Sequence, residues 1–130
     1  MKNFLVFFAL PYLLVTSCNS ENETLTLFSA LRPSETNIYF QNKLTEGPNT
    51  NVLLYEYFYN GAGVALADFN GDQLLDIYFT SNMEENKMYL NRGDFKFEDI
   101  SKISKTQGRS GPWKTGVTAV DINGDQRMDL

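Results

Sequence analysis

The sequence contains no histidine and only one cysteine. Without histidine, the usual general base, the Ser-His and Cys-His catalytic pairs and imidazole metal ligands are excluded. Because Cys18 has no second cysteine to pair with, a disulfide within the chain and cysteine-based zinc sites are excluded too. The sequence therefore predicts a protein that is not an enzyme.

Basic charge is also scarce. The chain carries 11 basic and 16 acidic residues, giving a formal net charge of -5, and no stripe of Lys or Arg interrupts this balance. An acidic protein gains nothing from the release of phosphate counterions, so we expect no nucleic-acid partner. Its hydrophobic content, 42%, is that of an ordinary globular protein. Multivalent cations are the partners that this charge favours.

The N-terminus lacks an apolar run long enough to span a membrane. Lys2 precedes an apolar stretch, residues 4–15, of about a dozen residues, whereas a spanning helix needs about 20. Residues 1–17 are therefore predicted to be a signal peptide. Val15-Thr16-Ser17-Cys18 resembles the bacterial lipobox, which implies lipidation of Cys18; the alternative is an ordinary signal peptide with a chance cysteine.

The segment after Cys18 is polar and has no apolar periodicity, as in the stretch NSENETLT. We expect residues 18–30 to be a tether between the lipid anchor and a folded body, with the anchor as the only membrane contact. No aspartate follows Cys18 directly. By resemblance to lipoprotein sorting rules, this favours an outer-membrane lipoprotein, facing either the periplasm or the cell surface.

An internal repeat organises the rest of the chain. A shift of 53 residues superimposes GVALADFNGDQLLDI, which begins at Gly63, on GVTAVDINGDQRMDL, which begins at Gly116, with eight of fifteen positions identical. A period near 50 is typical of propeller blades or another repeat array. We therefore assign residues 31–62 to N-terminal strands, 63–115 to the first repeat and 116–130 to a truncated second repeat.

Within the first repeat, short runs of β-branched and aromatic residues predict four strands. The expected strands are residues 63–67, 77–80, 87–91 and 95–98, with a tight turn at residues 92–94. Residues 37–41 and 52–59 are also strand-like, and Trp113 is the one large anchor in the connection 100–115. The predicted fold is all-β: a fragment of a β-propeller with one complete four-stranded blade and partial neighbours.

Each copy of the repeat contains the loop pattern D-x-N-G-D-Q-x-x-D between two strands. Side-chain oxygens at positions 1, 3, 5 and 9, with the carbonyl of position 7, can converge on one hard cation, and a flexible, ligand-rich oxygen loop favours Ca²⁺ over Mg²⁺. Six of the eight aspartates lie in these loops. The predicted ligands are Asp68, Asn70, Asp72, Leu74 and Asp76 in the first loop, and Asp121, Asn123, Asp125, Arg127 and Asp129 in the second.

The loop pattern is also compatible with a metal-free turn and, in part, with an EF-hand. Asp, Asn and Gly form good turns without any metal, but two in-register copies that even repeat the glutamine favour a metal site. An EF-hand shares the early spacing, but it needs flanking helices and a glutamate at position 12, where this chain has Phe79. We therefore predict calcium loops between strands.

These two loops, preceded by Gly-Ala-Gly-Val-Ala, resemble FG-GAP or VCBS-type repeats, the calcium loops of integrin-α-type propellers. The stretches YFQN, YFYNGAG and NKMYLNRGDFKFED further resemble bacterial secreted relatives of cartilage acidic protein. The resemblance covers roughly residues 38–130 and implies a propeller of about seven blades with an extracellular binding role. Such loops usually have glycine at position 6, where the backbone φ is positive, but this chain has Gln73 and Gln126.

The expected function is a calcium-binding, non-enzymatic scaffold for binding or adhesion at the cell envelope, with an unknown protein or polysaccharide ligand. The alternative is an accessory propeller of an envelope polysaccharide hydrolase whose catalytic part lies elsewhere. Arg92-Gly93-Asp94 is an integrin-type tripeptide, but we interpret it as a hairpin turn. The aromatic cluster at residues 55–59 is interpreted as core rather than as a sugar platform.

Overall fold

The computed structural model describes residues 27–130. The predicted signal peptide, Cys18 and the first part of the predicted tether lie outside the described residues. Within residues 27–130, no helix has the length and apolar character needed to cross a bilayer.

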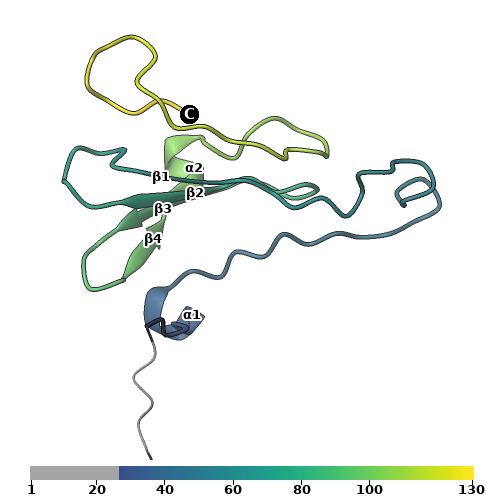
Figure 1. Cartoon of the computed structure of the whole chain (residues 1–130), viewed down its shortest axis with the longest axis horizontal. Coiled ribbons are helices and arrows are strands. Elements are labelled where there is room, and N and C mark those ends of the chain that lie inside the picture. Colours follow the sequence, from purple (N-terminus) through teal and green to yellow (C-terminus); the bar gives the residue numbers. More distant parts are fainter. Residues whose placement is uncertain (1–26) are drawn as a thin grey trace, which may run out of the picture.

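The fold is built on one antiparallel sheet of four strands (Figure 1). The strands are β1 (Val64–Ala67), β2 (Asp76–Phe79), β3 (Lys87–Asn91) and β4 (Phe97–Asp99), and each pairs with the next along the chain. Two short helices, α1 (Pro33–Thr36) and α2 (Ser101–Ser104), complete the regular structure of the described residues. The all-β class and the four-stranded unit predicted from the sequence are confirmed.

The fourth strand begins later than expected. Asp94 and Phe95 adopt positive φ angles of 48° and 55°, so the turn after β3 extends to Lys96. Two backbone bonds close it: the Arg92 N–H donates to the Lys96 carbonyl at 2.7 Å, and the Lys96 N–H donates to the Gly93 carbonyl at 2.8 Å. The ring of Phe95 is 67% exposed. The predicted strand 95–98 is therefore wrong in its first two residues, but the turn at residues 92–94 is confirmed.

The two strands predicted upstream of the first repeat are absent from the structure. Residues 37–41 form no strand, and residues 52–59 form consecutive turns. Asn51 causes the second difference: its Oδ1 accepts the N–H groups of Leu53 at 3.0 Å and Leu54 at 3.3 Å. An asparagine that captures the next backbone N–H groups starts a turn, whatever the β-propensity of the residues that follow.

The two faces of the sheet are covered by different parts of the chain. On one face, Ala65, Tyr78 and Met88 form the core, and Val117 and Ala119 of the second repeat pack against it. On the other face, the ring of Phe40 stacks on Phe79 with a centroid distance of 4.6 Å. In Figure 1 the C-terminal segment (yellow) runs above the sheet and the N-terminal segment (blue) passes below it.

The packing of Val117 and Ala119 follows from the repeat. These two residues correspond, at a separation of 53 positions, to Val64 and Leu66 of β1, which alternate with Ala65 along that strand. In the second repeat, the residues at the positions of Val64 and Leu66 therefore pack on the Ala65 face of the first sheet. Val64 and Leu66 themselves are each 58% exposed.

Trp113 anchors the connection between the repeats, as expected. Its ring lies 4.4 Å from Tyr55 and 5.3 Å from Phe58, measured between centroids, and Phe58 is fully buried. The Trp113 N–H also donates to the carbonyl of Asn82. The aromatic cluster of residues 55–59 therefore contributes to the core through Phe58, and its turns are held against the connection.

Candidate metal centre

The first acidic loop, residues 68–76, connects β1 to β2. The register of the two strands places Ala67 directly opposite Asp76, so both ends of the loop are closed by strand pairing. Every predicted ligand of this loop therefore lies in one closed turn beside the sheet.

Asp68 is the centre of the loop. Its Oδ1 accepts the N–H groups of Gly71 at 2.7 Å and Asp72 at 3.2 Å, and its Oδ2 accepts the N–H of Gln73 at 2.7 Å. The bond from Gln73 is the largest cause that holds the pKa of Asp68 below its usual value. Because each N–H stabilises the ionised form, Asp68 is a carboxylate at neutral pH.

Asn70 and Asp72 are bonded to each other. The Asn70 Nδ2 donates to the Asp72 Oδ2 at 2.9 Å, and the Asn70 Oδ1 accepts the Asp72 N–H at 2.9 Å. The remaining oxygen of Asp72, Oδ1, accepts the N–H of Leu74 at 2.9 Å. Leu74 thus joins the network through its N–H group, and the contribution expected from its carbonyl stays a prediction.

Asp76 differs from the other acidic residues of the loop because it is completely buried. Its Oδ2 accepts the N–H of Phe69 at 3.0 Å, and its Oδ1 accepts the N–H of Asn91 at 2.8 Å. A buried carboxylate needs such partners, since losing them leaves a charge without solvation. Asp76 therefore ties the acidic loop to β3 as well as to β1.

The second loop repeats this network. The Asp121 Oδ1 accepts Gly124 N–H at 2.7 Å and Asp125 N–H at 3.1 Å, and its Oδ2 accepts Gln126 N–H at 2.8 Å. The Gln126 bond is the largest cause that lowers the pKa of Asp121. Asn123, Asp125 and Arg127 also reproduce the bonds of their counterparts, and Asp129 accepts the N–H of Ile122 as Asp76 accepts that of Phe69. An isolated β-bridge pairs Val120 with Asp129, which corresponds to the pairing of Ala67 with Asp76 between β1 and β2.

The backbone at position 6 of each loop has the positive φ expected for this type of loop. Gln73 has a φ of 69° and Gln126 a φ of 67°, in the left-handed region that disfavours residues with a Cβ. In both loops, the N–H of this glutamine donates to the first aspartate. The positive φ of each glutamine thus orients its N–H group toward the first aspartate of the loop.

The chemistry of the loops suits a hard cation. Their side chains offer carboxylate and amide oxygens, and each ionised carboxylate has about four acceptor positions, of which Asp68 uses three and Asp72 two. Among residues 27–130, however, no three His, Cys, Asp or Glu side chains converge as closely as a metal site requires. The loops therefore provide the type of oxygen ligand that Ca²⁺ prefers. Their conformation is stabilised by backbone N–H groups that donate to the carboxylates.

The two loops lie beside each other. A cleft of about 430 Å³ is lined by Asp68, Asn70 and Gly71 of the first loop and by Gln126 and Arg127 of the second. The sequence pattern predicts each loop separately and does not indicate that Arg127 of the second loop lines a cleft with Asp68 of the first. The stacking of Val117 and Ala119 on the first sheet brings the two loops to the same end.

Asn91 is a structural partner of the loop that the sequence pattern did not indicate. Its N–H holds Asp76, and its Nδ2 donates to the carbonyl of Leu75 at 3.0 Å. Pairing of Ile77 with Tyr89 continues, two residues on, to Leu75 opposite Asn91. The register of the predicted strands was therefore the signal that could have found it.

Sheet, loop and repeat together define a unit of a β-sheet repeat protein with an acidic loop between its first two strands. Residues 68–130 match the family model of the FG-GAP-like repeat, so this part of the chain is similar to that repeat. Neither the curated proteins nor the solved structures contain a match.

Proposed function

We propose that the chain is a calcium-binding, non-enzymatic scaffold for binding or adhesion at the cell envelope. The observation that carries this proposal is the duplicated loop network, in which two copies of D-x-N-G-D-Q-x-x-D adopt the same hydrogen bonds beside each other. The match to the FG-GAP-like repeat supports a β-propeller-like scaffold as the framework of these loops.

The proposed ligands are the side-chain oxygens at loop positions 1, 3, 5 and 9 and the carbonyls of Leu74 and Arg127. Drawing three carboxylates to about 4 Å from one another around a single point would cost roughly 4 kcal/mol of repulsion per pair at an effective dielectric constant near 20. Bound Ca²⁺ supplies the positive charge that reverses this repulsion. The protein itself holds the loop through N–H donors, so it presents a largely preformed turn to the ion.

A calcium titration of the full chain tests this function. We expect Ca²⁺ to raise the melting temperature and the resistance to protease, because a ligand that binds only the folded state stabilises it by mass action. Asp72→Ala combined with Asp125→Ala should abolish the shift, and Asp94→Ala, outside the loops, is the matched control. If Ca²⁺ and Mg²⁺ produced the same small shift in all three proteins, the calcium function would be rejected.

The envelope location rests on the sequence around Cys18. We propose that Cys18 carries the lipid anchor of an outer-membrane lipoprotein, with the repeats on the periplasmic side or the cell surface. Metabolic labelling with palmitate, in a bacterial host that processes lipoproteins, should label the wild type and not Cys18→Ala. A labelled Cys18→Ala protein would contradict the anchor at this residue.

A further inference from the structure

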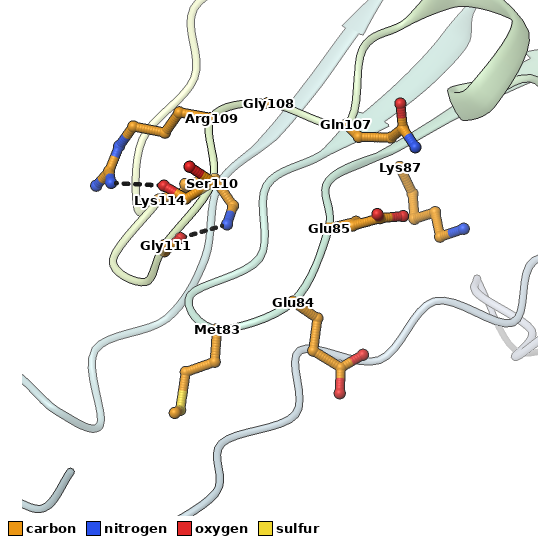
Figure 2. Close-up of a pocket in the computed structure, with 10 residues that line it drawn as sticks. All are labelled: Met83, Glu84, Glu85, Lys87, Gln107, Gly108, Arg109, Ser110, Gly111 and Lys114. Atoms are coloured by element: carbon orange, nitrogen blue, oxygen red, sulfur yellow. Dashed lines mark hydrogen bonds between the residues drawn. The ribbon is translucent and has the colours of Figure 1, made fainter. Parts of the chain in front are cut away.

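The β2–β3 connection lies at the opposite end of the sheet from the acidic loops, because β2 starts at Asp76 and runs away from them. Two hollows flank this connection. The first, of about 660 Å³, lies between residues 83–87 and residues 107–114 (Figure 2). The second, of about 290 Å³, lies between the same connection and residues 39–43. Both hollows are lined by Glu84, Glu85 and Lys87, so one ligand could contact both.

The wall of the first hollow is held in place by buried contacts. Asn86, which is 5% exposed, donates its N–H to the carbonyl of Gln107 at 3.0 Å and its Nδ2 to the hydroxyl of Tyr78 at 2.8 Å. A Cβ at Gly108, where φ is +79°, would lie 2.5 Å from the Asn86 Nδ2. Gly108 therefore lies close against Asn86, whose hydrogen bonds join the two walls of the hollow.

The charges around the hollows nearly cancel, although the chain as a whole carries -5. The acidic lining residues are Glu84, Glu85 and Asp99, and the basic ones are Lys43, Lys87, Arg109 and Lys114. An anion would meet the carboxylates, and a cation would meet the ammonium and guanidinium groups. A neutral ligand with many hydroxyl groups can instead donate to the acids and accept from the bases.

Two of these cations disfavour a positively charged ligand in particular. Arg109 and Lys114 have no carboxylate within ion-pair distance in the described part of the chain; they donate instead to the carbonyls of Pro112 at 2.8 Å and Gly111 at 2.9 Å. Partial burial, and then the nearby charge of Arg109, lower the pKa of Lys114. An additional cation at this wall would increase the same repulsion.

The second hollow adds an aromatic surface. Tyr39 is 67% exposed, whereas Tyr89, which lines the same hollow, is only 3% exposed. An exposed aromatic face beside planar carboxylate and amide groups, here including Gln41, suits the C–H face of a sugar ring. The Lys87–Asp99 pair, at 2.8 Å, offers a donor and an acceptor at the edge of this surface.

We propose that the two hollows form a binding site for a neutral oligosaccharide, with Tyr39 as the stacking residue and Glu84, Glu85 and Lys87 as shared hydrogen-bonding residues. This inference rests on the proposed binding function and names its ligand class and location. The site uses no residue of the acidic loops.

The test is a titration of the full chain, labelled with ¹⁵N, with cellohexaose, maltohexaose and chitohexaose as neutral probes and hexagalacturonate as the acidic one. We expect at least one neutral probe to shift the amide signals of residues 84–87 and 107–114. Its affinity should not change when the salt concentration rises from about 0.05 to 0.5 M, because a neutral ligand releases no counterions. If no neutral probe shifts these amides, or hexagalacturonate binds as tightly, the proposal is wrong.

Two substitutions test the location of the site and whether the ligand is neutral or acidic. Tyr39→Ala should weaken binding of the neutral probe about three- to tenfold, whereas Tyr57→Ala, which removes an exposed tyrosine outside both hollows, should not. Glu85→Gln should weaken a neutral ligand and strengthen an acidic one. Unchanged affinity in Tyr39→Ala, or tighter binding of the neutral probe by Glu85→Gln, would overturn the proposal.

The same spectra separate this proposal from the calcium function. We expect calcium binding to shift the amide signals of Gly71, Gln73, Gly124 and Gln126, and oligosaccharide binding to shift those of residues 84–87. Sugar shifts without calcium shifts would reject the metal function alone. Calcium shifts without sugar shifts would reject the oligosaccharide site alone.

Discussion

The two acidic loops contain the same internal hydrogen bonds but differ in what surrounds them. The first closes into a four-stranded sheet, where Asp76 is fully buried and receives an N–H from Asn91 of β3. The second closes on a single bridge between Val120 and Asp129, and the Asp129 carboxylate accepts one N–H group, that of Ile122 at 3.2 Å. The conformation of the loop is therefore local, whereas the burial of its last carboxylate depends on the sheet.

The largest difference between the loops is expected for their last aspartate. Asp76→Ala leaves the N–H groups of Phe69 and Asn91 without an acceptor and should lower the free energy of unfolding by about 2 to 5 kcal/mol. Asp129→Ala should change it by less than about 0.5 kcal/mol, because that site is not enclosed by a sheet. Urea denaturation of both variants measures the two values, and equal losses would show that the sheet does not distinguish the loops.

The next difference concerns the glycine that begins each repeat. A Cβ at Gly63 would lie 3.0 Å from the Thr115 oxygen and the Val117 nitrogen, both backbone atoms, whereas a Cβ at Gly116 has open space. Gly63→Ala should destabilise the fold by about 1 to 3 kcal/mol through overpacking. Gly116→Ala should be neutral or stabilising by up to about 1 kcal/mol. Thermal unfolding of the pair checks this, and a tolerated Gly63→Ala would mean that the repeats are not closely packed there.

A smaller effect is expected at position 6 of the loops. Gln73→Gly and Gln126→Gly relieve a left-handed residue, at a cost in chain entropy, and should each stabilise the protein by about 0.5 to 1 kcal/mol. Gln73→Ala retains a Cβ and serves as the control. Denaturation midpoints compare the variants; a gain in Gln73→Ala equal to that in Gln73→Gly would exclude backbone strain as the cause.

The smallest effect is that of an ion pair found only in the first repeat. Lys87 and Asp99 lie 2.8 Å apart, and residues 116–130 have no ion pair in the described structure. The hydrogen bond to Asp99 is the main cause that raises the pKa of Lys87. Burial acts to raise the pKa of Asp99, but the hydrogen bonds from Lys87 and Ser101 outweigh it, so this pKa is lowered.

The pH dependence of the pair follows from these directions. The Asp99 contribution is present above about pH 4 and is lost as the pH falls through its lowered folded pKa, whereas the Lys87 contribution is present below about pH 10 and is lost as the pH rises through its raised folded pKa. Both side chains are partly exposed, so the pair is worth less than about 1 kcal/mol. Denaturation of wild type and Asp99→Asn should differ most between these limits; a constant difference across the whole range would contradict the assignment.

The sequence predicted the acidic loops well because their bonds join residues that are close along the chain. Asp68 accepts N–H groups only from residues three to five positions later, so the pattern itself contains the partners. β1, β2 and β3 were predicted within one residue at each end, since alternation and β-branched or aromatic residues agree there. The β-sheet class followed from these strands and from the repeat.

The sequence-based predictions failed where a side chain bonds the neighbouring backbone, or where a residue distant in sequence packs against the segment. Residues 52–59 have the composition of a strand, but Asn51 bonds the next N–H groups, and Trp113, more than fifty positions away, packs on Tyr55 and Phe58. The role of Asn91 depends on a bond across 15 positions. The β-strand propensity of a segment depends on its own residues and does not include contacts with residues distant in sequence.

Trp113 is the only tryptophan of the chain; its ring contacts Tyr55 and Phe58, and its backbone N–H donates to the carbonyl of Asn82. Its fluorescence therefore originates from a single place, where the turns of residues 52–59 meet the connection between the repeats. Emission on excitation of the indole should move to longer wavelength when these segments separate. The protein thus carries its own optical reporter of the junction between its repeats.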